Sequence, residues 1–158
     1  MATILFICSG NTCRSPMAAA MAGRYLALAG SPVPVASAGV DACAGRAASA
    51  LAVTVMEQMG LSLAGHRACR VTPGDLRQAD LVLAMEGWQL GVLAALDPSA
   101  ARRSFTLTAF TGEPGDVSDP FGGDLAVYRQ CARELDRLVG KALTRYLDGP
   151  DFSLSGRE

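Results

Sequence analysis

Residues 4–16 constrain the fold more than any other stretch of the chain. Ile4-Leu5-Phe6-Ile7 is an uninterrupted apolar run, which is typical of a buried strand. The polar stretch from Cys8 to Pro16 follows directly, and the Ala-rich stretch after it, Met17 to Leu28, predicts a helix. We therefore expect a thiol at the carboxyl end of a strand, on a loop that opens into a helix N-terminus.

Such a loop has the properties of an anion-binding site. A helix N-terminus presents backbone N–H groups that have no partners, and a loop wrapped over it directs more of them inward. Arg14 adds a planar set of donors that matches two phosphate oxygens. Helix ends and a nearby guanidinium lower the pKa of a thiol, so we expect Cys8 to be partly or wholly thiolate at neutral pH.

The remaining loop residues suit this geometry. Gly10 and Asn11 tolerate the positive φ that a tight loop requires. Ser15 is expected either to cap the helix or to turn its hydroxyl toward the Cys8 sulfur, with Pro16 in the first helical position. The plain alternative is a buried cysteine with a chance arginine six positions later. Neither of the two glycine-rich nucleotide-binding motifs, Gly-x4-Gly-Lys-Ser/Thr and Gly-x-Gly-x-x-Gly, occurs.

Cys-x-Gly-Asn-x-Cys-Arg-Ser-Pro after the first strand, with Asp119-Pro120 late in the chain, resembles the low-molecular-weight protein tyrosine phosphatase family. The resemblance covers Thr3 to about Tyr146. It implies that Cys8 is the nucleophile and that Arg14 binds the transferred phosphoryl group. The implied phosphate-binding positions between and beside them are Ser9, Gly10, Asn11, Thr12, Cys13 and Ser15.

The resemblance also assigns proton transfer to Asp119. A leaving group needs a proton, and a carboxylic acid on a loop supplies it. In the family this aspartate then acts as the base for the water that hydrolyses the cysteinyl phosphate. The bland alternative is that Asp119-Pro120 only initiates a turn, as we expect of Asp116 after Gly115. The resemblance further implies that His66 supports Asn11; otherwise His66 is an ordinary hydrogen-bonded loop residue.

Two positions bear on the substrate. Tyrosine-directed members of the family usually have a bulky aliphatic residue where this chain has Thr12, and aromatic residues after the Asp-Pro pair. Thr12 and Phe121-Gly122-Gly123 instead resemble the bacterial protein arginine phosphatases of the same family. Phe121 could stack on a phenol or on a guanidinium. We therefore expect phosphoarginine as the substrate, with phosphotyrosine as the alternative.

Two other function classes are less well supported. An arsenate reductase on the same fold needs further cysteines near the site, and the stretch 81–95, where they would lie, has none. A non-catalytic reader of phosphorylated proteins needs no nucleophile, yet Cys8, Arg14 and Asp119 are all present. No cofactor or metal is expected, because Arg14 and the loop amides supply the charge that phosphoryl transfer requires.

The composition narrows the setting. A chain of 158 residues is expected to form a single domain over 1–158. Five scattered cysteines, no Cys-x2-Cys pair and one histidine argue against a disulfide framework and a zinc site. Net charge is −1, so nucleic acid is not expected as a partner, and no apolar run approaches the ~18 residues of a membrane span. We expect a cytoplasmic enzyme, since no signal peptide is recognisable, that acts on phosphorylated proteins and releases inorganic phosphate.

A reactive thiolate is open to oxidation, and Cys13 lies on the same tight loop as Cys8. We expect peroxide to form a Cys8–Cys13 disulfide. Its signature is a thiol-reversible inactivation that the Cys13→Ser variant lacks.

The alternation of strands and helices predicts an α/β three-layer sandwich around a four-stranded parallel sheet of order 2-1-3-4. Expected strands cover 3–7, 35–39, 80–85 and 104–107, and expected helices cover 16–29, 46–59, 73–78, 87–96 and 124–147. We expect a long loop over 108–123 and a frayed tail over 148–158. Ligands of such sheets bind at the carboxyl ends of the strands, which is where Cys8 lies.

Overall fold

The structure is a computed structural model that describes residues 3–149. Four parallel strands form one sheet in the order β2-β1-β3-β4, as the sequence predicts. Their bounds are Thr3–Cys8 (β1), Val35–Gly39 (β2), Ala79–Ala84 (β3) and Ser104–Thr106 (β4). Most of the expected tail, 150–158, lies outside the described residues.

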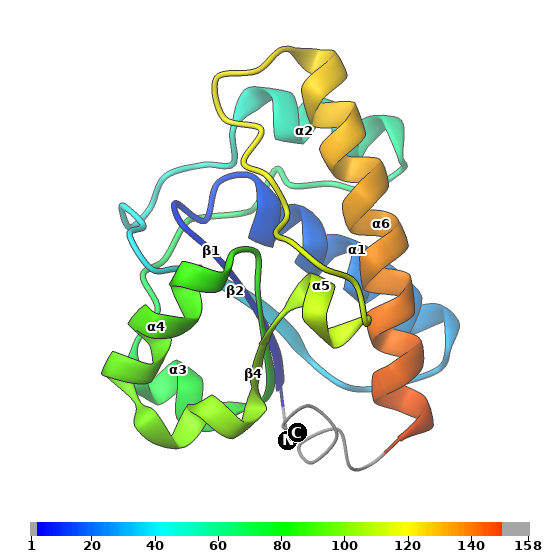
Figure 1. The fold of residues 1–158 in the computed structure, drawn as a ribbon. Helices are drawn as coiled ribbons and strands as arrows, with labels where there is room; N and C mark the ends of the chain where they lie inside the picture. The colour runs from blue at the N-terminus through cyan, green and yellow to red at the C-terminus, as the bar shows by residue number, and fades with distance from the viewer. Residues whose placement is uncertain (1–2, 150–158) are drawn as a thin grey trace.

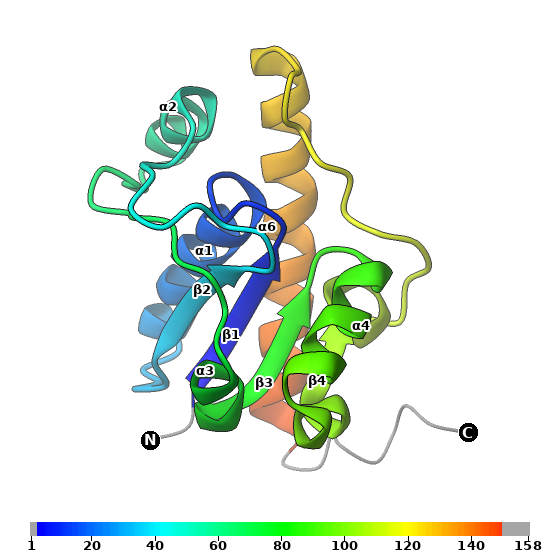
Figure 2. The same cartoon turned by 90° about the vertical axis from the view of Figure 1, so that its left-hand side faces the viewer.

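Helices cover both faces of this sheet, which makes three layers (Figures 1 and 2). Ile4 and Phe6 face the layer that contains α1 (Arg14–Leu28), α2 (Ala50–Gln58), α5 (Leu107–Phe110) and α6 (Leu125–Asp148). Leu5 and Ile7 face the other layer, with α3 (Pro73–Gln78), α4 (Gly87–Leu96) and the 3-10 turn η1 (Pro98–Arg103). The central strand is therefore apolar throughout because it is buried on both faces.

The first helix begins two residues earlier than predicted. Cys13 precedes the first helical residue, Arg14, and Ser15 makes no cap. Pro16 is in the third helical position, where its missing N–H still costs no intrahelical hydrogen bond. Of the two expectations for Ser15, the hydroxyl directed at the Cys8 sulfur is the one that the structure has.

The expected helix over 46–59 is also shorter in the structure. Residues 46–49 remain a loop, because the Arg46 carbonyl accepts the Ala68 N–H and the Gly45 N–H donates to the Ala68 carbonyl. The helix begins only after Ser49, whose hydroxyl accepts the Ala52 N–H. The predicted long loop over 108–123 likewise contains one helical turn, α5, which is capped by the Thr106 hydroxyl.

The β2 exit packs tightly on the first loop of the chain. Val40 N–H donates to the Cys8 carbonyl, and Asp41 N–H donates to the Ser9 carbonyl. A Cβ at Gly39 would lie 2.5 Å from the Ser9 carbonyl oxygen and 3.0 Å from the Asn11 nitrogen. Only glycine permits this approach, which fixes the Cys8–Arg14 loop against the end of β2.

Candidate active site

The Cys8 sulfur lies at the end of β1, where two polar groups contact it. The Ser15 hydroxyl is 2.9 Å away, and the Asn11 N–H donates to the sulfur at 3.3 Å. Asn11 Nδ2 donates to the Ser15 oxygen at 2.8 Å, so the hydroxyl hydrogen is directed to an acceptor, and the sulfur at 2.9 Å is nearer than the Ala38 carbonyl at 3.5 Å. Ser15 therefore stabilises the thiolate form of Cys8.

The expected low pKa of Cys8 is wrong for this structure. Burial raises the pKa of the thiol, because only 2% of the residue is exposed and a charged sulfur loses its hydration. Hydrogen bonds from Ser15, the Arg14 charge and the Asn11 N–H lower the pKa but do not offset burial. The sequence correctly predicted the groups that favour the thiolate and missed how deeply the sulfur is buried.

Asn11 holds the loop in shape. It is fully buried and has φ of 55°, a left-handed conformation that asparagine tolerates. Its side chain donates to Ser15 and Ser37 and accepts the Cys69 N–H. The His66 ring Nε2 lies 2.7 Å from the Asn11 carbonyl, to which it donates. The structure thus brings His66 to the residue that the family resemblance implied.

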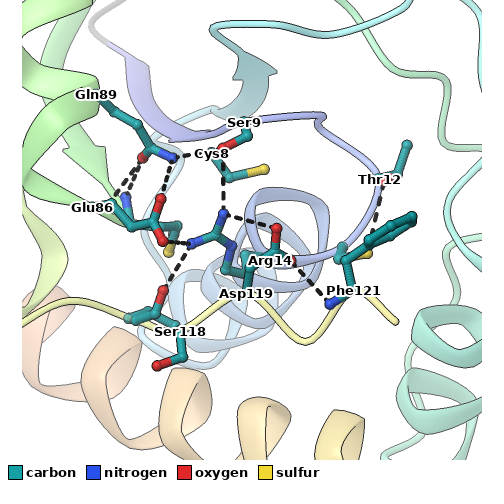
Figure 3. Close-up of polar contacts among 12 residues, drawn as sticks. Cys8, Ser9, Thr12, Arg14, Glu86, Gln89, Ser118, Asp119 and Phe121 are labelled. Carbon is teal, nitrogen blue, oxygen red and sulfur yellow. Dashed lines mark hydrogen bonds and ion pairs between the residues drawn. The ribbon is translucent and has the colours of Figure 1, made fainter. Parts of the chain in front are cut away.

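Arg14 forms the floor of the site and is 1% exposed. Its Nη1 lies 3.1 Å from Glu86 Oε1 and donates to the Val117 carbonyl at 2.8 Å. Its Nη2 lies 3.5 Å from Asp119 Oδ2 and 3.5 Å from the Ser9 hydroxyl oxygen. Figure 3 shows the guanidinium between the Glu86 and Asp119 carboxylates. A buried cation with this many partners keeps a fixed orientation.

Glu86 and Gln89 are site residues that the sequence patterns did not identify. Gln89 is fully buried; its Nε2 donates to the Ser9 hydroxyl at 3.2 Å, and its Oε1 accepts the Glu86 N–H (Figure 3). Together they connect the start of α4 to the Cys8–Arg14 loop. One signal was available, because Glu86 follows Met85 at the carboxyl end of β3, the edge at which ligands of parallel sheets bind.

A cavity of about 250 Å³ opens above Cys8 and Arg14. The expected site residues among those that line it are Cys8, Ser9, Gly10, Thr12, Cys13, Arg14, Asp119 and Phe121. Asp119 and Phe121 come from the loop before α6, and the Asp119 carboxylate accepts the Phe121 N–H at 3.1 Å. Asn11, Ser15 and His66 are not part of this lining: the first two are buried, and His66 contacts the Asn11 carbonyl. Three residues that the sequence did not single out, Asp41, Cys43 and Arg46, form part of the rim.

Three further expectations concern residues on or next to the cavity, and their outcomes differ. Gly122 has φ of +82°, and a Cβ at Gly123 would lie 2.8 Å from Val127, so local geometry already requires both glycines before α6. Asp116 accepts the Gly87 N–H at the start of α4, a structural role like the one expected. Cys8 and Cys13 are both free and buried, so their disulfide stays a prediction.

The residues of the site do not include a metal-binding cluster. Within residues 3–149, no group of three or more His, Cys, Asp or Glu side chains is placed to hold a metal ion. In the same part of the chain, no helix has the length and apolar character that crossing a membrane requires.

Residues 3–148 match the family described as low molecular weight phosphotyrosine protein phosphatase. The chain belongs to this family. A protein named protein-arginine-phosphatase, from Geobacillus stearothermophilus, is 42% identical over 139 residues, which cover 87% of this chain and 91% of that protein. A probable low molecular weight protein-tyrosine-phosphatase from Ralstonia solanacearum is 38% identical over 137 residues, which cover 87% of this chain and 90% of the relative.

A solved structure gives the same result. It is a mutant of the YwlE arginine phosphatase with a phosphorylated active-site serine, and it is 36% identical to this chain. It superimposes with a TM-score of 0.88 over 96% of this chain and 99% of its own. The family therefore includes members named for arginine and for tyrosine substrates, and the residues of this chain have to decide between them.

Proposed function

We propose that the protein hydrolyses phosphoarginine side chains of proteins through a cysteinyl-phosphate intermediate. The observation that carries the proposal is the cavity, where the Thr12 side chain and a single aromatic ring, Phe121, stand over the Cys8 nucleophile and Arg14. A threonine presents a polar, β-branched wall where tyrosine-directed members present an aliphatic one. The similarity to a protein-arginine-phosphatase supports the same choice.

In the first step the Cys8 thiolate attacks phosphorus, and an S–P bond forms as the P–N bond breaks. The Asp119 carboxyl group gives its proton to the departing nitrogen, so that the guanidine leaves as a cation. This proton is needed because the guanidinium pKa exceeds ~12, which makes the unprotonated form a poor leaving group. Arg14 and the loop N–H groups bind the phosphoryl oxygens while charge builds up on them.

In the second step Asp119, now a carboxylate, takes a proton from water. The water oxygen attacks phosphorus, the S–P bond breaks, and Cys8 returns as a thiolate while inorganic phosphate leaves. The buried sulfur must lose its proton before the first step. Ser15, Asn11 and Arg14 are the groups that stabilise the resulting charge.

The test is a side-by-side assay of one peptide that carries either phosphoarginine or phosphotyrosine. We expect a higher kcat/KM for the phosphoarginine peptide and complete loss of turnover in Cys8→Ser with both. A higher kcat/KM for the phosphotyrosine peptide would assign the alternative substrate of the same family. Release of nitrophenol from an aryl phosphate by wild type separates an enzyme from a non-catalytic reader.

A further inference from the structure

We propose that Asp41 is a specificity-determining residue that binds the guanidinium of the substrate; this inference rests on the proposed function. Asp41 is exposed on the loop after β2 and lines the same cavity as Cys8 and Asp119. Its side chain has no hydrogen bond or ion pair with any of residues 3–149, so its carboxylate is free to pair with a ligand.

The backbone holds Asp41 beside the nucleophile loop. Its N–H donates to the Ser9 carbonyl at 2.9 Å, and Val40 N–H before it donates to the Cys8 carbonyl at 3.0 Å. Gly39 before them is also held, because its N–H donates to the Cys69 carbonyl at 2.9 Å and its carbonyl accepts the Val71 N–H at 3.0 Å. The carboxylate is therefore attached to a rigid wall of the cavity rather than to a mobile loop.

The chemistry of the substrate favours a carboxylate other than Asp119 at this place. A phosphorylated guanidine enters with its phosphoryl group on Arg14 and its positive charge one bond further out. Asp119 carries a proton when it acts as an acid, so it is neutral and does not balance that charge. Glu86 is paired with Arg14 and does not line the cavity. Of the carboxylates around the site, Asp41 is the one that lines the cavity and remains available.

Arg46 is the other charged residue of this rim, and like Asp41 it has no ionic partner within the described part of the chain. Its positive charge repels a guanidinium. A phenol ring carries no net charge, so neither the Asp41 carboxylate nor the Arg46 guanidinium attracts or repels it by charge. Substitutions of the two rim residues are therefore expected to affect the substrate preference differently. Removal of Asp41 disfavours phosphoarginine relative to phosphotyrosine, and removal of Arg46 does not.

The experiment compares wild type with Asp41→Asn, Asp41→Glu and Arg46→Gln on matched phosphoarginine and phosphotyrosine peptides. Asp41→Asn is expected to lower kcat/KM for the phosphoarginine peptide about tenfold, which is the scale of one lost hydrogen bond to a charged group. The kcat/KM for the phosphotyrosine peptide is expected to stay within about twofold of wild type. Asp41→Glu keeps the negative charge and is expected to lower kcat/KM for the phosphoarginine peptide less than Asp41→Asn does. Glu57→Gln, on the exposed side of α2, makes the same change of net charge away from the cavity and is expected to behave as wild type.

A second measurement uses added salt, which screens exposed charges. The kcat/KM of wild type for the phosphoarginine peptide is expected to fall more steeply with ionic strength than that of Asp41→Asn. Equal loss with both peptides in Asp41→Asn, or a fall of the substrate ratio in Arg46→Gln as well, would show a disturbed rim and overturn the inference. If wild type prefers phosphoarginine and Asp41→Asn matches it, the inference fails and the proposed function stands. If wild type does not hydrolyse phosphoarginine peptides, both fail.

Discussion

At the scale of single residues, the pKa of Cys8 is the quantity that the structure decides. Burial raises this pKa, and the Ser15 hydroxyl is the first of the groups that lower it. Because the pKa lies above the usual value for a thiol, the reactive thiolate forms as pH rises. The rate of Cys8 chemistry is therefore expected to increase with pH through the neutral range and above it.

We predict that Ser15→Ala raises the pKa of Cys8 by about one unit, because the thiolate loses a hydrogen bond to a charged group. The measurement is the pH dependence of Cys8 alkylation by iodoacetamide. Ser37→Ala serves as the control, since Ser37 contacts Asn11 and not the sulfur. An unchanged alkylation profile in Ser15→Ala would show that the 2.9 Å contact does not stabilise the thiolate.

Thr12 is the second residue for which a substitution is informative. Thr12→Ile replaces the hydroxyl by an apolar group on the wall of the cavity, so we expect the ratio of kcat/KM values to shift toward phosphotyrosine by about tenfold, the scale of one hydrogen bond to a charged group. Thr12→Ser keeps the hydroxyl and is expected to keep the preference for phosphoarginine. The same ratio in wild type and Thr12→Ile would remove Thr12 from the account of specificity.

At the scale of elements, the loop between α5 and α6 carries Asp119 to the cavity. We predict that Asp119→Asn lowers kcat by a factor of about 10² to 10⁴ for substrates with poor leaving groups, and less for aryl phosphates whose phenols need little protonation. A uniform loss over a series of aryl phosphates with different leaving groups would contradict a role in proton transfer.

The control for this variant lies on the same loop. Asp116→Asn replaces the carboxylate that accepts the Gly87 N–H by a neutral amide whose oxygen still accepts, so we expect a slightly lower melting temperature and an unchanged dependence on the leaving group.

The contact between β2 and the Cys8–Arg14 loop leads us to predict a loss of stability and activity when Gly39 is substituted. Gly39→Ala would place a methyl group 2.5 Å from the Ser9 carbonyl, so we expect a loss of about 1–3 kcal/mol in unfolding free energy together with reduced activity. Denaturant unfolding and turnover measure the two effects. Gly91→Ala is the matched control: nothing lies within 4 Å of that added carbon, and alanine in an exposed helix stabilises by about 0.5–1 kcal/mol.

At the scale of the whole molecule, the loop that carries Asp119 is tied to α6 through Glu113. Its carboxylate lies 2.7 Å from Arg137 and 2.9 Å from Lys141, and these hydrogen bonds lower the pKa of Glu113 from 4.5 to about 2. A carboxyl group whose pKa is lowered in the folded state stabilises the fold at pH values above its ordinary pKa of 4.5. That contribution is lost as pH falls from about 5 toward 2.

We therefore predict that Glu113→Gln lowers the melting temperature at pH 7 by about 2 °C or less, since the group is exposed. The difference between variant and wild type is expected to vanish as pH approaches 2. A melting-temperature difference that is the same at pH 7 and pH 2.5 would assign the effect to packing rather than charge. Added salt at pH 7 is expected to reduce it as well.

The sequence by itself was sufficient for the sheet order, for most element bounds and for the loop that contains Cys8 and Arg14. These follow from local patterns: apolar runs, helix stops and a short motif with restrictive residues. The structure departs from the predicted helix starts at two places, 14 instead of 16 and 50 instead of 46. The first is a local effect, since the Met17 N–H donates to the Cys13 carbonyl, whereas the second was decided by the hydrogen bonds of Gly45 and Arg46 with the distant Ala68.

Only the tertiary structure decided the electrostatics of the site. The Cys8 motif predicts a low pKa, yet the sheet and helices that bury the sulfur reverse the direction of the shift. Glu86 and Gln89, at the start of α4, and Asp41, after β2, lie on two separate segments and carry no motif. They reach the site because the carboxyl ends of parallel strands converge at one edge of the sheet. The nucleophile is thus a property of a local sequence, while its protonation and the charge around the substrate are properties of the packed chain.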